Sequence, residues 1–131
     1  MPEKKTKQRA RKAKSPSTKA GAYVREEMDH VREGKHGARS TKQAIAIGLS
    51  KARRAGVKVP SRPGTKAVKA TKRKPNAKRS RATSNALKRE GRAAASHKAI
   101  SRQVRSSARA RGPAKRSAAA KKAARTRARR A

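Results

Sequence analysis

The sequence predicts a mostly α-helical protein, in which a short helical hairpin is flanked by disordered or partly helical arms rich in Lys, Arg and Ala. Two observations lead to this fold class. The chain has 42 Lys or Arg residues against six Asp or Glu in 131 residues, a net charge of +36, and high charge with low hydrophobicity is typical of disorder. Apolar spacing typical of helices, together with four of the six acids, is concentrated in the segment 20–60.

Residues 1–19 are predicted to be a disordered basic arm, because they carry eight basic residues and one acid. Within this arm, residues 15–19 (SPSTK) resemble the minor-groove elements of linker-histone tails. An ordinary linker turn is the simpler interpretation of the same residues.

Residues 20–60 are predicted to form a helix–loop–helix domain. In the first helix, Val24, Met28 and Val31 recur at i, i+4 and i+7 and so share one face. Gly34 follows as a natural C-terminal stop.

The second helix is predicted to begin with Ser40 as its N-cap, because Gln43 three residues later completes a capping box. Gly48 lies in the apolar stripe and permits a close approach of the two helices, and Gly56 ends the helix. Large apolar side chains are few, so we expect the hairpin to need further contacts. These would come from the C-terminal helices, from a bound polyanion or from a homodimer formed through the hairpin.

Residues 61–80 are predicted to be a Pro/Lys-rich linker, and residues 81–131 a basic helical tail. The tail contains a short helix from Ser84 that Gly91 closes, a longer helix that stops at Gly112-Pro113, and an Ala/Lys/Arg-rich helix that Pro113 begins. Because like charges oppose helix formation, we expect these helices to strengthen on a phosphate backbone.

The excess of basic residues predicts binding to nucleic acid, since six acids cannot neutralise 42 cations within the chain. We expect DNA binding without sequence preference, with bridging or compaction of duplexes, as in histone-like proteins of the nucleoid. Tyr23 is the only aromatic residue, which argues against a domain that stacks bases on aromatic rings.

The basic side chains expected to contact nucleic acid lie in the hairpin loop, the second helix, the linker and the tail. Phosphate contact is favoured over base readout, because the loop is longer than the turn of a helix-turn-helix motif. The residues are Lys35, Arg39, Lys42, Lys51, Arg53, Arg54, Lys72, Arg73, Lys74, Lys78, Arg79, Arg102, Arg105, Arg109, Arg111, Lys121, Lys122, Arg125, Arg127, Arg129 and Arg130.

No enzyme, cofactor or metal site is predicted. The chain has no Cys, the spacing of His30, His36 and His97 matches no metal-ligand pattern, and no nucleophile–base–acid set is visible. The N-terminus lacks an apolar signal-peptide region, and no apolar run approaches the length of a membrane span of about 20 residues. We therefore expect a cytoplasmic protein at the nucleoid, with no membrane or small-molecule partner.

The block AGAYVREEMDHVREGKHGARSTKQAIAIGLSKARRAGVKVP, residues 20–60, resembles a domain of unknown function found in small basic bacterial proteins. Those proteins are often labelled plasmid stabilization or DNA-binding proteins, and their tails resemble residues 81–131. The resemblance implies a bacterial origin and a role at the nucleoid or in plasmid maintenance. It implies no functional residues.

Two alternatives remain open. The first is a ribosomal or ribosome-associated RNA-binding protein, because charge alone does not separate DNA from RNA. The second is a protein-interaction module or antitoxin that uses the acidic face of the first helix, formed by Glu26, Glu27 and Asp29. Pairing of these acids with basic residues of the same chain is the simpler explanation of that face.

Overall fold

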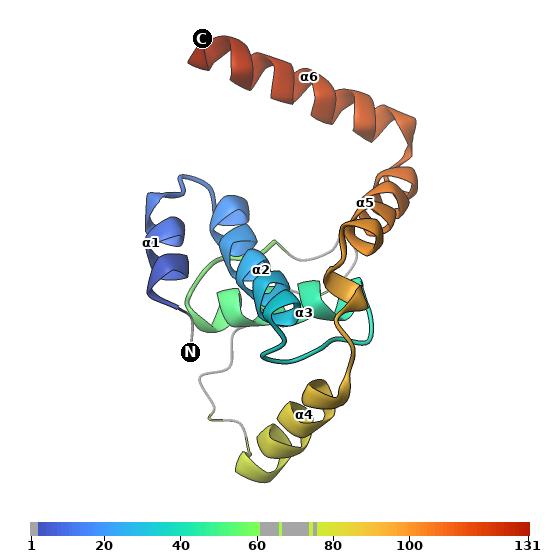
Figure 1. Ribbon diagram of the computed structural model, residues 1–131. Coiled ribbons are helices and arrows are strands. Elements are labelled where there is room, and N and C mark those ends of the chain that lie inside the picture. The colour runs from blue at the N-terminus through green and yellow to red at the C-terminus, as the bar shows by residue number, and fades with distance from the viewer. Residues whose placement is uncertain (1–2, 61–65, 67–73, 75) are drawn as a thin grey trace. The chain divides into compact units, whose positions relative to one another are not determined.

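The structure is a computed structural model that describes residues 3–60, 66, 74 and 76–131 (Figure 1). Within these residues it is helical without strands, which confirms the mostly α fold. The chain divides into two compact units, Met1–Ser96 and His97–Ala131. The elements are α1 (Lys4–Lys12), α2 (Pro16–Glu33), α3 (Thr41–Arg54), α4 (Ala77–Arg89), the 3₁₀ helix η1 (Ala93–Ala95), α5 (His97–Ala110) and α6 (Gly112–Arg130).

Helix α2 begins four residues before the predicted hairpin, within the SPSTK segment. Ser15 is its N-cap, and the Ser15 hydroxyl accepts a hydrogen bond from the backbone N–H of Thr18 at 3.2 Å, while Pro16 occupies the first turn. The helix ends at Gly34, whose φ of 78° is left-handed, as the sequence predicted. Residues 15–19 are therefore a helix start in this fold.

Helix α3 begins after Ser40, the N-cap that the sequence predicts, although the Gln43 side chain bonds to the residue before the cap. The Ser40 hydroxyl accepts from the backbone N–H of Gln43 at 3.2 Å, and Gln43 Oε1 accepts from the N–H of Arg39 at 2.7 Å. Helices α2 and α3 pack against each other, and a β-carbon on Gly48 would lie 2.6 Å from Cα of Val24. The predicted close approach at Gly48 is confirmed.

Where the sequence predicted a disordered arm, the structure has helix α1, which packs against α2. Its buried face consists of Thr6 and Ala10, one helical turn apart. The backbone N–H of Glu3, the N-cap residue, donates to the buried carboxylate of Glu26 at 2.6 Å. The spacing of large apolar residues does not reveal this contact surface, because its buried side chains are small.

The core between α1, α2 and α3 is correspondingly built around small residues. Tyr23, which is 4% exposed, is the one large side chain among its fully buried members. The buried members are Ala10, Ala20, Tyr23 and Ala52, and the half-buried ones are Ala22, Leu49, Val57 and Val59.

The segment after α4 completes this unit, which therefore extends past the boundary at residue 60 that the sequence predicted. Ala94 and Ala95 of η1 are buried, and η1 contacts both α2 and α3. The Thr41 hydroxyl donates to the carbonyl of Ala94 at 2.6 Å, and Arg32 Nε donates to the carbonyl of Ala95 at 3.0 Å. Helix α4 begins after Asn76, earlier than the Ser84 start expected from the sequence.

The second unit consists of α5 and α6, which contact each other and bury none of their own residues. Gly112 has a φ of 77° and Pro113 lies in the first turn of α6, so the predicted break between the two helices is confirmed. Val104 is 61% exposed on α5. In the described part of the chain, no helix combines the length and the apolar character that crossing a membrane requires.

Candidate nucleic-acid interface

A groove of about 1130 Å³ opens in the first unit among α1, the start of α2 and the end of α3. We call it the basic groove, because half of the residues that line it are Lys or Arg. Its basic residues are Lys7, Arg11, Lys19, Lys51, Arg54 and Lys58, and its other residues are Ala10, Pro16, Tyr23, Ala55, Gly56 and Val57.

The basic groove is lined without any carboxylate, although the protein's acids lie on the same unit. Ala10 and Tyr23 are both nearly fully buried and form part of its apolar wall. Cations from three helices that converge on one concave surface raise the local positive potential and attract polyanions. The arrangement is suited to a phosphate backbone.

Four of the six basic residues of this groove were not among those predicted to contact nucleic acid: Lys7, Arg11, Lys19 and Lys58. The prediction treated residues 1–19 as an arm without fixed structure, so it had no basis for choosing among their cations. Lys7 and Arg11 lie at i and i+4, and a helix over this segment places them on one face. That spacing is the signal that was available in the sequence.

Lys35 lies in the hairpin loop as predicted, but its ammonium group forms ion pairs with carboxylates. Its Nζ lies 2.8 Å from Oε1 of Glu3 and 3.1 Å from Oε2 of Glu33. The Lys35 ammonium, with a further contribution from His30, lowers the pKa of Glu3 to about 2. The hydrogen bond to Glu3 in turn raises the pKa of Lys35.

Two further predicted contact residues are also engaged within the chain. Arg39 Nε lies 3.7 Å from Oε1 of Glu90, with most of the arginine side chain exposed. Lys51 donates to Oε1 of Glu27, which has no exposed surface, while the Lys51 side chain is 26% exposed. Of these two residues, Lys51 is the more firmly held, because its partner is buried.

The remaining predicted residues that the structure describes lie on exposed or half-buried positions of both units. Lys42 and Arg53 belong to α3, and Lys78 and Arg79 to α4, while Lys74 lies before α4 and is exposed. Lys72 and Arg73 fall outside the described residues.

In the second unit the predicted cations gather on the two helices. Arg111, which lies between them, and Arg127 and Arg130 of α6 are exposed. A hollow of about 630 Å³ on α5 is lined by His97, Lys98, Ser101, Arg102, Arg105, Ser106 and Arg109. A second hollow of about 520 Å³ on α6 is lined by Ala118, Lys121, Lys122, Arg125, Thr126 and Arg129.

All six carboxylates have partners within the chain, which accounts for the acidic face of α2. Four Lys or Arg residues form ion pairs with carboxylates in the described parts of the structure: Arg32, Lys35, Arg39 and Lys51. Glu26 accepts from the N–H of Glu3, and Glu26 and Glu27 are buried. Pairing with basic residues of the same chain, the simpler explanation offered by the sequence, therefore holds for Glu27 and Asp29, whereas Glu26 accepts from a backbone N–H. Most of the positive charge of the described residues is left unpaired.

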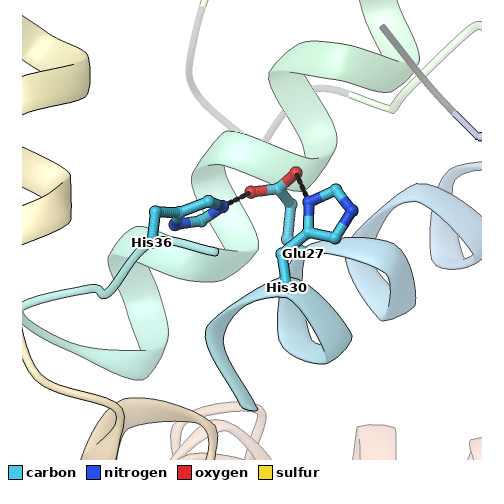
Figure 2. A group of neighbouring side chains, drawn as sticks. All are labelled: Glu27, His30 and His36. Carbon is cyan, nitrogen blue, oxygen red and sulfur yellow. Dashed lines mark ion pairs between the residues drawn. The ribbon is translucent and has the colours of Figure 1, made fainter. Parts of the chain in front are cut away.

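The sequence predicted no metal site, yet the fold gathers three side chains with metal-binding chemistry (Figure 2). Oε2 of Glu27 lies 3.1 Å from Nε2 of His36, and Oε1 lies 3.7 Å from Nδ1 of His30. Glu27 and His30 are three residues apart on α2, and His36 follows the turn at Gly34. Spacing alone does not reveal this group, because the turn, and not a fixed interval, returns His36 to Glu27.

Residues 4–63 match the model of a family of unknown function (DUF6496). The matched segment contains α1, α2 and α3, so it includes the helix that precedes the block on which the sequence resemblance rested. No curated protein and no solved structure matches the chain.

Proposed function

We propose that the protein binds nucleic acid through phosphate contacts without sequence preference, with duplex DNA as its main partner, and that it bridges or compacts duplexes. The observation that carries the proposal is the basic groove, in which six cationic side chains converge and five of them form no ion pair with a carboxylate of the described residues; Lys51 pairs with the buried Glu27. Each phosphate that a cation neutralises releases a condensed counterion, so binding is strong at low salt and weakens steeply as salt rises.

Bridging is supported by the division of the chain into two units with separate cationic surfaces. The first unit carries the basic groove, and the second carries the hollows on α5 and α6. Two linked binding surfaces engage two duplexes, or two segments of one duplex, with a high effective concentration for the second contact. The proposed role is that of a histone-like protein of the bacterial nucleoid that contributes to plasmid maintenance.

The lack of sequence preference follows from the kinds of residues at these surfaces. Lys and Arg contacts to phosphates position a protein on a duplex but carry no direct base readout. Tyr23, the one aromatic residue, is buried in the wall of the basic groove and is 4% exposed, so it offers little surface on which to stack a base.

Burial of acidic residues supports a nucleic-acid partner over the interaction-module alternative. Glu26 and Glu27, two of the three acids that the alternative requires on a surface, are buried inside the first unit. A protein that docks on the acidic face of α2 would meet chiefly Asp29 and Glu33, which are already paired with Arg32 and Lys35.

The test is a competition titration of the full-length protein against duplex DNA and structured RNA of equal length, across a salt series. We expect DNA to compete at least as well as RNA, with a steep salt slope and equal affinity for unrelated sequences. A clear preference for RNA at every salt concentration would overturn the DNA assignment and favour a ribosome-associated role.

Bridging is tested separately with two duplexes that carry a donor and an acceptor fluorophore. Energy transfer should appear at substoichiometric protein and disappear at high salt. Binding without energy transfer at any ratio would contradict the bridging part of the proposal.

A further inference from the structure

We propose that Glu27, His30 and His36 form a binding site for one divalent transition-metal cation, with Zn²⁺ as the best fit. This inference does not depend on the proposed nucleic-acid function. The three residues, which we call the Glu–His cluster, lie in the first unit at the end of α2 and in the loop that follows (Figure 2).

The geometry of the Glu–His cluster is close to that of a zinc site. One oxygen of Glu27 and one nitrogen of each imidazole lie within 4.8 Å of one another. A tetrahedral Zn²⁺ with bonds of about 2.0–2.2 Å places its ligand atoms about 3.3–3.5 Å apart. Oε2 of Glu27 lies 3.1 Å from Nε2 of His36 and Oε1 lies 3.7 Å from Nδ1 of His30, so each imidazole faces one oxygen of the same carboxylate at close to this spacing.

The outer nitrogen of each imidazole has a hydrogen-bond acceptor of the kind that supports metal-binding histidines. His36 Nδ1 lies 3.0 Å from the carbonyl oxygen of Gly37, and His30 Nε2 lies 3.2 Å from Oε1 of Glu3. A histidine that ligates a metal through one nitrogen usually donates the other N–H to a carbonyl or carboxylate, which fixes the ring. Both histidines of the cluster have such a partner.

The same hydrogen bonds favour a proton on the outer nitrogen of each ring. A carbonyl and an ionised carboxylate have no proton to give, so the outer nitrogen of each ring is the donor. In its neutral form an imidazole has one N–H, so a ring whose outer nitrogen donates has the lone pair of its inner nitrogen free for a metal ion.

Burial leaves one carboxylate oxygen of the cluster available to a ligand. Glu27 has no exposed surface, and its Oε2 has no hydrogen-bond donor in the described structure. Lys51 donates to the other oxygen, Oε1, so Oε2 remains available to a metal while Lys51 keeps its place. A buried carboxylate oxygen that has no hydrogen-bond partner and lies 3.1 Å from an imidazole nitrogen is an independent indication of a ligand.

Carboxylates gather around His30 although the protein as a whole is strongly positive, and two of them also pair with a lysine, Glu3 with Lys35 and Glu27 with Lys51. Glu3 and Glu26 form a second group with His30, with ligand atoms within 4.8 Å of one another. With Glu27, half of the protein's six acids therefore lie beside a single imidazole. Imidazole ligands disfavour Mg²⁺ and Ca²⁺, which prefer oxygen, whereas two imidazoles and one carboxylate suit Zn²⁺ with water at the fourth position.

The test is a titration of Zn²⁺ into the full-length protein, purified without a polyhistidine tag and stripped of metal with a chelator. We expect one ion to bind per chain by calorimetry, and Co²⁺ in place of Zn²⁺ to give the visible absorption of a four-coordinate ion. The absence of saturable Zn²⁺ binding to the wild-type protein would overturn the proposal.

The matched variants are His36→Gln, which removes one ligand, and His97→Gln, which removes the histidine at the start of α5 in the other unit. His36→Gln should weaken Zn²⁺ binding by at least about 100-fold, since even outer-shell partners contribute about 10- to 100-fold. His97→Gln should leave the affinity unchanged. Equal affinity of the two variants would show adventitious binding and contradict the assignment.

Nitrogen-15 NMR of the imidazole rings in the wild-type protein gives the same information if His36→Gln fails to fold. Addition of Zn²⁺ should shift Nδ1 of His30 and Nε2 of His36 and leave the ring of His97 unaffected. Shifts of equal size at all three rings, or at His97 alone, would contradict the site.

Discussion

A β-carbon on Gly48 would lie 2.6 Å from the Cα atom of Val24, closer than β-carbons approach other atoms in proteins. Helices α2 and α3 therefore touch backbone to backbone at this point. Gly21, which is also inside a helix, has nothing within 4 Å of the corresponding position. The two helical glycines thus have different roles, and the difference is measurable.

Gly48→Ala should lower the free energy of unfolding by about 1–3 kcal/mol, because the added methyl group forces the two helices apart. Gly21→Ala is the matched control and should raise it by about 0.4–1 kcal/mol, since alanine favours the helix and meets no neighbour. Urea denaturation followed by circular dichroism measures both. Equal stabilisation by the two changes would contradict the close packing at Gly48.

Lys51→Met should destabilise the first unit, because it leaves the buried carboxylate of Glu27 without its ammonium partner. Loss of one partner of a buried pair costs about 3–5 kcal/mol, and the 26% exposure of Lys51 places the expected loss near the lower value. Lys42→Met, at an exposed position of α3, should change stability by less than about 0.5 kcal/mol. Thermal melts of both variants provide the measurement, and equal effects would show that the pair contributes little.

The basic groove predicts which cations determine the salt dependence of DNA binding. The double variant Arg11→Gln/Arg54→Gln removes two unpaired groove cations and should reduce the slope of log K against log salt by about 1.8, or 0.9 for each phosphate contact. Lys35→Gln/Arg39→Gln removes the same charge from residues that are paired with carboxylates, and should reduce the slope by less than about 1. Fluorescence anisotropy at several salt concentrations distinguishes the two.

If both double variants reduce the slope equally, binding depends on total charge and the basic groove has no special part in it. If neither changes the slope, the phosphate contacts are made elsewhere, and the α5 and α6 surfaces become the next ones to test.

The lowered pKa of Glu3 predicts that acid weakens the contact between α1 and α2. Its pKa in the folded protein is lowered from the ordinary 4.5 to about 2, chiefly by Lys35. The unfolded chain therefore takes up this proton first as the pH falls. The stabilisation is complete above pH 4.5 and is lost progressively as the pH falls through about 2.

Glu3→Gln removes this titration, so wild type and variant should differ in melting temperature at pH 7 and converge as the pH approaches 2. An NMR titration of the Glu3 carboxyl carbon reports its pKa directly. A midpoint near the ordinary 4.5 would contradict the ion pair with Lys35.

Local signals in the sequence determined the helical hairpin. The capping residues Ser40 and Gln43, the left-handed turn at Gly34 and the break at Gly112-Pro113 all appear where the sequence predicted them. These features depend on the backbone and on neighbours a few residues away, so they can be read from a short stretch of chain. Net charge likewise follows from composition alone.

Tertiary structure decided the contacts of α1 and η1, which local sequence patterns do not predict. Helix α1 packs through Thr6 and Ala10, and η1 packs through Ala94 and Ala95, so both contact surfaces consist of small side chains that apolar periodicity does not reveal. The unit consequently extends to Ser96 instead of ending near residue 60.

The two candidate sites depend on the same distant contacts. The basic groove joins residues of α1 to residues at the end of α3, and the Glu–His cluster forms because the turn at Gly34 returns His36 to Glu27. The sequence by itself determined the charge, the helices and their ends, because each depends on composition or on near neighbours. Tertiary packing decided which cations converge and which of them pairs with a buried carboxylate, because packing brings separate segments of the chain together.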